Sequence, residues 1–333
     1  MKLTEFLDKQ RSMIDREMEA VIPRESEIED LYTAHWEFLG QGGKRWRPIM
    51  CVLVHECLGG NAEDILPFAA SIELIHNFSL IHDDIEDGDR SRRGIPTLWV
   101  KYGVPKAINI GDNLLNKAYE SATRLKERNV PLEKILWAIE LLSRSTATLS
   151  EGQALEMSFL DRWDVTEDEY LEMVWKKTGV LVSAACAGGA YLANSDRSVV
   201  EDMREYGRLI GPAFQIVDDV LNVSGDYEKY KKEIGGDIGE GKKTLMVIHL
   251  LEHCSPGIRE EARSILAKPR EETSKEDYAR VIEMMRDHGS IEYARGVASD
   301  YLARAKGKMM CLPDVEERDI LLELTEFLVR RNF

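Results

Sequence analysis

The sequence has few cysteines and no excess of basic residues, and both features narrow the classes of protein to consider. Its five cysteines among 333 residues are scattered, odd in number and form no C-x-x-C pair. We therefore expect neither a disulfide framework nor a zinc site. The formal net charge of -16 argues against nucleic acid or anionic lipid as a partner, because both bind clustered lysine and arginine.

Long apolar runs and targeting signals are also scarce. No apolar run reaches the roughly 20 residues needed to cross a bilayer, and the amphipathic start, MKLTEFLDKQRSMIDREMEA, is unlike a signal peptide. We therefore expect a cytoplasmic protein without stable membrane association. The sequence contains no Walker motif and no G-x-G-x-x-G, so nothing in it supports nucleotide binding.

Strand signals are few, whereas helix signals occur along the whole chain. Few segments alternate with period two, and no Asn-Gly or Asp-Gly turn lies between β-branched runs. Capping boxes are expected at 166–169 and 274–277, and helix ends at Gly40 and Gly289. Because there is no low-complexity linker and no solenoid repeat, we expect an all-α fold of about a dozen helices in a single domain, residues 1–333.

Three local features carry further expectations. Pro48 is expected at the first position of a helix over PIMCVLVHECL, where the missing N–H of proline costs nothing. The glycine-rich, charged stretch SGDYEKYKKEIGGDIGEGKK, residues 224–243, has weak helical periodicity and predicts an exposed loop. Gly188 and Gly189 match no phosphate-binding loop and are expected to allow close packing of helices.

Two acidic clusters lie on helices that are otherwise apolar. In LIHDDIEDGDRSRRG, residues 80–94, five acids fall within seven positions. At about 100° per residue, one helical face carries Ile72, His76, Ser79, Asp83 and Asp87. The second cluster is AFQIVDDVLN, residues 213–222, where helical spacing again places polar side chains on one face: Gln215, Asp218, Asp219 and Asn222.

The two acidic clusters predict a bound divalent cation. Two carboxylates about 6 Å apart repel by about 3 kcal/mol at an effective dielectric of 20, and a divalent cation removes that repulsion. Mg²⁺ prefers oxygen ligands and binds through one or two carboxylates plus substrate phosphates. A single D-D-x-x-D is equally compatible with a solvated helix end. Two such clusters favour a Mg²⁺–diphosphate site, with each cluster forming one half.

Basic residues accompany the acids in four groups. Arg92 and Arg93 follow the first cluster, and a rigid guanidinium fork suits diphosphate oxygens. The motif GGKRWRP, residues 42–48, adds Lys44, Arg45 and Arg47. The other two groups are Lys176, Lys177 and Thr178 before a glycine, and Lys231, Lys232, Lys242 and Lys243 around the glycine-rich stretch. One diphosphate cannot use all of them, so the surplus predicts two diphosphate substrates.

The motifs together resemble those of a known family. GGKRWRP, LIHDDIEDGDRSRRG, KTG, FQIVDD and GGDIGEGKKTL, in this order and over most of the chain, are similar to the motifs of the trans-isoprenyl diphosphate synthases, in particular short-chain archaeal-type enzymes. The resemblance implies an all-α bundle around a deep central cavity, usually a homodimer. It further implies condensation of isopentenyl diphosphate with an allylic diphosphate, with three Mg²⁺ ions per site.

The resemblance also assigns roles to individual residues. It implies that Mg²⁺ is bound by Asp83 and Asp87 on one wall, with Asp84 beside them, and by Asp218 on the other wall, with Asp219 among the catalytic residues. Positions that hold the allylic diphosphate are matched by Arg92, Lys177, Thr178, Gln215, Lys232 and Lys242. Positions that hold isopentenyl diphosphate are matched by Lys44, Arg47, His76 and Arg93, although a lone helical histidine is more often structural.

One departure from the family pattern leaves alternatives open. Asn222 stands where many relatives have aspartate, and an amide contributes no charge to a metal site. With Asp226 it makes the second motif faintly similar to that of class I terpene cyclases. A cyclase with one substrate would not require GGKRWRP and Arg93. A non-catalytic subunit would be free to lose acids that this chain retains.

The expected reaction follows from electrostatics. Metal ions and cationic side chains stabilise a departing diphosphate, isopentenyl diphosphate attacks the allylic cation, and the cavity must exclude water. Ser79, one turn below Asp83, leaves room for a growing chain. In the family, a large residue five positions before the first motif, here Phe78, forms a floor. The pattern resembles synthases of the C20 product, geranylgeranyl diphosphate, with farnesyl diphosphate or a C15/C20 mixture as the alternative.

Overall fold

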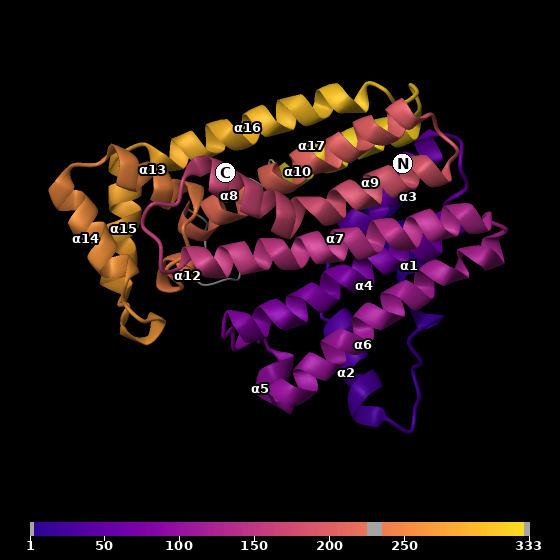
Figure 1. The fold of residues 1–333 in the computed structure, drawn as a ribbon, viewed down its shortest axis with the longest axis horizontal. Helices are drawn as coiled ribbons and strands as arrows, with labels where there is room; N and C mark the ends of the chain where they lie inside the picture. The colour runs from indigo at the N-terminus through magenta and orange to yellow at the C-terminus, as the bar shows by residue number, and fades with distance from the viewer. Residues whose placement is uncertain (1–2, 225–234, 330–333) are drawn as a thin grey trace. The chain divides into compact units, whose positions relative to one another are not determined.

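The computed structural model describes residues 3–224 and 235–329, and these are helical almost throughout (Figure 1). The expected all-α class is confirmed. The α-helices are α1 Leu3–Glu19, α2 Glu29–Gly40, α3 Trp46–Cys57, α4 Ala62–Glu86, α5 Leu98–Tyr102, α6 Val104–Thr123, α7 Leu132–Phe159, α8 Glu167–Val174, α9 Val180–Leu192, α10 Arg197–Ser224, α12 Gly236–Gly239, α13 Leu245–His253, α14 Pro256–Leu266, α15 Lys275–Asp287, α16 Ser290–Met309 and α17 Glu316–Val329. Short helical segments are η1 Arg124–Arg128, η2 Trp175–Gly179 and η3 Arg270–Glu272, and a small hairpin pairs β1 Ser91–Arg92 with β2 Ile95–Pro96.

The chain divides into two compact units, each drawn from three segments. The first unit comprises Met1–Ala147, Leu181–Gly207 and Lys308–Leu324, and the second comprises Thr148–Val180, Arg208–Gly307 and Thr325–Phe333. Within the first unit, α4 packs against α1, α3 and α6 (Figure 1). Within the second unit, α13 packs against α8, α14 and α15. The expectation of one domain over residues 1–333 stays a prediction.

Helix α4 is the central helix of the first unit. It begins after Asn61, whose side chain accepts a hydrogen bond from the Glu63 N–H, and acids in its first turn complement the positive helix end. Among the described helices, α4 alone is long and apolar enough to cross a membrane, so the expectation that no segment qualifies is wrong for this helix. However, 78% of its most apolar window is buried inside the protein, as in a core helix.

Two adjacent glycines of α9 lie against α3 and α4. A Cβ atom at Gly188 would overlap the ring of Phe68 on α4. A Cβ atom at Gly189 would lie 2.5 Å from the carbonyl oxygen of Cys51 on α3. Both positions therefore require glycine for close approach of the helices, which confirms the role predicted for them.

The predicted helix ends are found in the structure, with one correction. Thr166 and Ser274 each open a helix in a reciprocal capping box. Helix α2 ends at Gly40, and Gly289, with φ of 67°, lies two residues after the end of α15. The prediction for Pro48 is wrong, because α3 begins at Trp46 and the proline is the third helical residue. It is still within the first turn, where no intrahelical N–H bond is lost.

The glycine-rich stretch differs from its predicted form where the structure describes it. Residues 225–234, which include Asp226, Lys231 and Lys232, lie outside the described residues. Residues 235–243 form α12 and the turn after it, and they are buried or half-buried. A Cβ atom at Gly235 would lie 3.1 Å from the Tyr278 ring, and one at Gly239 would lie 2.5 Å from its hydroxyl. The expected exposed loop is therefore wrong for residues 235–243, because these glycines pack the backbone onto α15.

Candidate active site

The first acidic cluster, Asp83, Asp84 and Asp87, occupies the last turns of α4 and the residue after it. Carboxylate oxygens of Asp83 and Asp87 lie within 4.8 Å of one another, as their one-turn spacing predicts. Asp84 is 1% exposed. Burial raises the pKa of Asp84 to about 6, although Arg92 acts in the opposite direction. The cluster therefore combines two half-buried acids with one acid whose ionisation is costly.

The hairpin after α4 brings Arg92 onto these acids. Positive φ angles at Arg93 and Gly94 are those of a type I′ turn, which suits a two-residue hairpin connection. The Arg92 Nε atom donates to Asp84 Oδ1 at 2.6 Å, and its Nη2 atom lies 3.5 Å from Asp83 Oδ2. The predicted grouping of Arg92 with the first cluster is thus present in the structure.

Residues assigned to isopentenyl diphosphate also meet in the first unit. Arg47 Nη1 donates to His76 Nε2 at 3.1 Å. Burial, followed by the charge of Arg47 and other nearby arginines, holds the pKa of His76 well below its usual range, so the ring is a neutral acceptor. Arg93 donates to the carbonyl of Gly42, which places it beside the GGKRWRP motif. Arg47 and Arg93, which are distant in the sequence, therefore both lie near His76.

Arg45 differs from its neighbours because its charge is already used inside the protein. Its side chain is 2% exposed, and its Nη1 atom donates to Glu73 Oε1 at 2.8 Å. It also donates to Asp15 at 3.2 Å and to the Leu39 carbonyl at 2.7 Å. Arg45, the residue before α3, therefore links α1, α2 and α4. Sequence reasoning missed Glu73, although a lone charge within the apolar run of α4 signals a buried partner.

The second acidic cluster lies on α10, and its two aspartates have different environments. Asp219 is buried, and its oxygens accept from Tyr170 Oη at 2.6 Å and Gln215 Nε2 at 2.8 Å. Burial raises the pKa of Asp219 to about 6 against those two hydrogen bonds. Thr178 donates to Gln215 Oε1 at 3.1 Å, so the predicted pair of Thr178 and Gln215 is in contact. Asp218 is half-buried and is the better placed of the two aspartates to bind an ion.

A π-helical turn carries the lysines of the KTG motif. η2 interrupts the helical segment at Trp175–Gly179, and such turns are frequent at functional sites. A Cβ atom at Gly152 would overlap the backbone of Lys177, so α7 passes close to this turn. Lys177 forms an ion pair with Glu156, a residue that sequence reasoning missed. Lys176 instead pairs with Glu151 at 3.0 Å.

Asn222 and the two lysines after α12 have described partners. Asn222 Oδ1 accepts from the Asp237 N–H at 3.4 Å, and its carbonyl accepts from the Gly235 N–H at 2.9 Å. Asn222 thus secures the start of α12 in this structure. The Lys242 Nζ atom forms an ion pair with Glu240 Oε2 at 2.6 Å. Lys243 is buried and donates to the carbonyls of residues 160 and 241 at 2.9 and 2.8 Å, so its ammonium is bound by the backbone in this structure, and its place in a diphosphate-binding group stays a prediction.

The two residues linked to chain length lie next to each other on α4. Phe78 is buried and its ring contacts that of His82, with centroids 4.7 Å apart. The Ser79 hydroxyl donates to the His76 carbonyl at 2.8 Å within the same helix. The role of Phe78 as a floor stays a prediction.

The fold and the two clusters define a class: an all-α protein whose carboxylates and cations suit metal-bound diphosphates. A Polyprenyl synthetase family model matches residues 28–285. The chain is 40% identical to a short chain isoprenyl diphosphate synthase of Methanothermobacter thermautotrophicus, over 100% of this chain and 99% of the relative. It is 38% identical to a geranylgeranyl diphosphate synthase of Methanosarcina mazei, over 100% and 99% of the two chains. A crystal structure of geranylgeranyl pyrophosphate synthetase from Pyrococcus horikoshii matches with a TM-score of 0.92 and 35% identity, over 100% of both chains. This chain belongs to the polyprenyl synthetase family.

Proposed function

We propose that the protein is a Mg²⁺-dependent trans-prenyltransferase that condenses isopentenyl diphosphate with allylic diphosphates and yields mainly geranylgeranyl diphosphate. The observation that carries this proposal is the close pair Asp83 and Asp87 beside Arg92, in a chain of the polyprenyl synthetase family. The two relatives from Methanosarcina mazei and Pyrococcus horikoshii, which are named for geranylgeranyl, support the C20 product. A homodimer, a cytoplasmic location and three ions per site complete the proposal.

Mg²⁺ would be held by Asp83, Asp87 and Asp218. The carboxylate oxygens of Asp83 and Asp87, within 4.8 Å of one another, fit a hard cation that prefers oxygen ligands. When bound, the ions supply Lewis-acid stabilisation of charge on the leaving diphosphate. Asp84 and Asp219 would act differently, since each is buried and accepts hydrogen bonds from neighbouring side chains. We infer that these two acids orient Arg92 and Gln215.

The cationic side chains would bind and orient the two substrates. The allylic diphosphate would be bound by Arg92, Lys177, Thr178, Gln215, Lys232 and Lys242. Isopentenyl diphosphate would be bound by Lys44, Arg47, His76 and Arg93. Because neutral His76 accepts from Arg47, it fixes the direction of that guanidinium.

The reaction would need no side-chain nucleophile. The allylic carbon–oxygen bond breaks and its electron pair leaves with the diphosphate, whose charge the bound cations stabilise. The double bond of isopentenyl diphosphate then forms the new carbon–carbon bond, and the proton lost from it passes to the departed diphosphate. Apolar walls would exclude water, which would trap the cation as an alcohol.

One incubation tests the proposal against its alternatives. The protein is mixed with Mg²⁺, labelled isopentenyl diphosphate and each allylic diphosphate in turn. Elongated, labelled products support the proposal. Unlabelled cyclic products would show a terpene cyclase, and no product would show a non-catalytic subunit. Asp87→Asn is expected to lower kcat by about 100-fold or more, whereas Asp300→Asn, at an exposed position of α16, is a control with the same charge change.

Chain length is tested at Phe78. Phe78→Ala removes a buried ring and is expected to lengthen the products beyond C20. The exposed Phe327 of α17, changed to alanine, serves as the control for loss of a phenylalanine. An unchanged distribution of products in Phe78→Ala would contradict the floor.

A further inference from the structure

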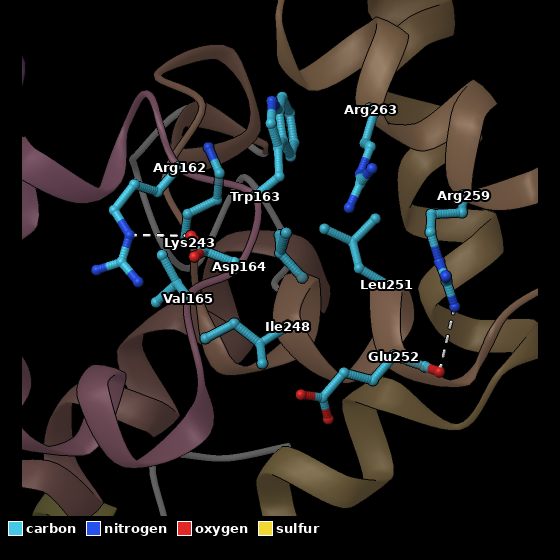
Figure 2. A pocket seen from close by; sticks show the side chains of 11 residues that line it. Arg162, Trp163, Asp164, Val165, Lys243, Ile248, Leu251, Glu252, Arg259 and Arg263 are labelled. Atoms are coloured by element: carbon cyan, nitrogen blue, oxygen red, sulfur yellow. Dashed lines mark hydrogen bonds and ion pairs between the residues drawn. The ribbon is translucent and has the colours of Figure 1, made fainter.

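A cavity lies within the second unit, and none of its lining residues is assigned to either substrate (Figure 2). Its volume is about 360 Å³, within the range of about 300–1,000 Å³ that is usual for small-molecule sites. The walls come from the loop between α7 and α8, from α13 and α14, and from Lys243. The proposed reaction leaves this cavity without a role.

One wall of the cavity is apolar. Val247, Ile248 and Leu251 of α13 line it, and helical spacing brings Val247 and Leu251 onto one face. Val165 adds a further apolar side chain from the loop after α7. Figure 2 shows Ile248 and Leu251 directed into the space between α13 and that loop. This wall would shield an apolar group of a ligand from water.

The cavity is also lined by two arginines of α14. Arg259 and Arg263 are one turn apart, and neither forms an ion pair with a carboxylate in the part of the chain that the structure describes. Arg259 donates to the carbonyls of Glu252 and Cys254 at 3.4 and 3.5 Å. The Arg263 Cζ atom lies 5.6 Å from the centroid of the Trp163 ring. The Nε atom of Arg263 is buried without a hydrogen-bond partner in the described structure. These arginines therefore have donors left for an anion.

Other charged groups also line the cavity, and one of them, Arg162, is already paired with acids. Arg162 pairs with Asp164 at 3.0 Å and with Glu169 at 2.9 Å, so two carboxylates already balance its single positive charge with an excess of one negative charge. In the view of Figure 2, Leu251 lies between the Glu252 carboxylate and the Arg263 guanidinium. In a protein with a net charge of -16, this cavity is lined by four cationic side chains and only two acidic ones, Asp164 and Glu252, and its lining therefore favours an anion.

We propose that this cavity binds a small amphiphile with a phosphate or diphosphate head and an apolar tail. The guanidinium groups of Arg259 and Arg263, one helical turn apart, offer N–H donors to phosphate oxygens. The tail lies on Val247, Ile248 and Leu251, and the Trp163 ring closes the opposite side. Both halves of the ligand are thus recognised by separate groups.

Lys243 connects the cavity with the segment that carries Lys242. It lies 4.3 Å from the Trp163 ring centroid while its ammonium binds the carbonyls of Leu160 and Gly241. An occupant that attracts Lys243 would weaken those two bonds and shift Lys242. This coupling rests on the proposed function, in which Lys242 binds the allylic substrate. By linkage, the two ligands would change each other's affinity by the same factor.

Decyl phosphate is a suitable probe because its saturated chain cannot ionise to an allylic cation. Binding is followed through Trp163 fluorescence, with Trp163→Phe as the blank for the other five tryptophans of the six in the chain. We expect Arg263→Gln to weaken binding at least about tenfold. Arg286→Gln, at an exposed position of α15, has the same charge change and is expected to bind as the unaltered protein does. Without the probe, Arg263→Gln should elongate substrates normally.

Parallel titrations with inorganic diphosphate and with decanol separate the two halves of the ligand. Both are expected to bind more weakly than decyl phosphate. Three outcomes would overturn the site. Inorganic diphosphate or decanol could bind as tightly as decyl phosphate, Arg263→Gln and Arg286→Gln could bind decyl phosphate equally well, or decyl phosphate could fail to bind. The coupling predicts that decyl phosphate changes KM for the allylic diphosphate in the unaltered protein but not in Arg263→Gln. If decyl phosphate binds but KM for the allylic diphosphate is unchanged, the coupling is overturned. An inactive protein would refute the proposed function, and the fluorescence titration would still test the cavity.

Discussion

Asp84→Asn is expected to make the metal-free protein more stable at neutral pH. Asp84 is buried, and burial raises its pKa from the ordinary value of 3.8 to about 6. At about 1.4 kcal/mol for each pH unit between the two values, ionised Asp84 costs the folded state about 3 kcal/mol. The folded protein binds this proton more tightly than the unfolded chain. The stability that protonation of Asp84 gives the folded protein is therefore fully present below pH 3.8 and is lost as the pH rises through about 6.

Asparagine keeps the shape of the side chain and does not ionise. Arg92 retains its contact with Asp83 at 3.5 Å, so its charge is not left without an acid. The free energy of unfolding of Asp84→Asn should therefore exceed that of the unaltered protein by about 3 kcal/mol at pH 7 and by less than about 1 kcal/mol at pH 4. The physical reason is that the cost of burying a charge exceeds the attraction of Arg92.

The assay is urea unfolding followed by circular dichroism, with EDTA present, between pH 4 and pH 7.5. Asp300→Asn, an exposed substitution on α16 with the same charge change, should differ from the unaltered protein by less than about 0.5 kcal/mol at every pH. If Asp84→Asn is less stable than the unaltered protein at pH 7, the pair with Arg92 outweighs burial and the reasoning is refuted.

Three other substitutions test buried polar contacts and helix packing by the same urea assay. Glu73→Gln removes the closest acid from buried Arg45 and should cost about 3 kcal/mol; an unchanged midpoint would contradict that pairing. Tyr170→Phe removes a donor to buried Asp219 and should cost about 2 kcal/mol at pH 7. Without this hydrogen bond the pKa of Asp219 rises further, so the loss of stability should be smaller at pH 4 than at pH 7. An equal loss at both pH values would argue against a hydrogen bond to the ionised acid. Gly188→Ala overlaps a phenylalanine ring and should cost about 1–3 kcal/mol, whereas a neutral result would show that the ring can move.

The amino-acid sequence by itself determined the fold class, several helix ends and both acidic clusters. These features depend on residues within one or two turns of a helix, and helical spacing places such residues predictably. Asp83 and Asp87 are close because they are four residues apart on α4. The capping boxes at Thr166 and Ser274 follow from the same local geometry.

Only the tertiary structure decided which charges are used inside the protein and which remain for substrates. Arg45 and Lys243 resemble their neighbours in the sequence, yet Arg45 is paired with Glu73 and Lys243 binds backbone carbonyls. Asp219 likewise differs from Asp218 because it is buried against Tyr170. Burial and partners distant along the chain set the state of an ionisable group, and neither can be read from local spacing.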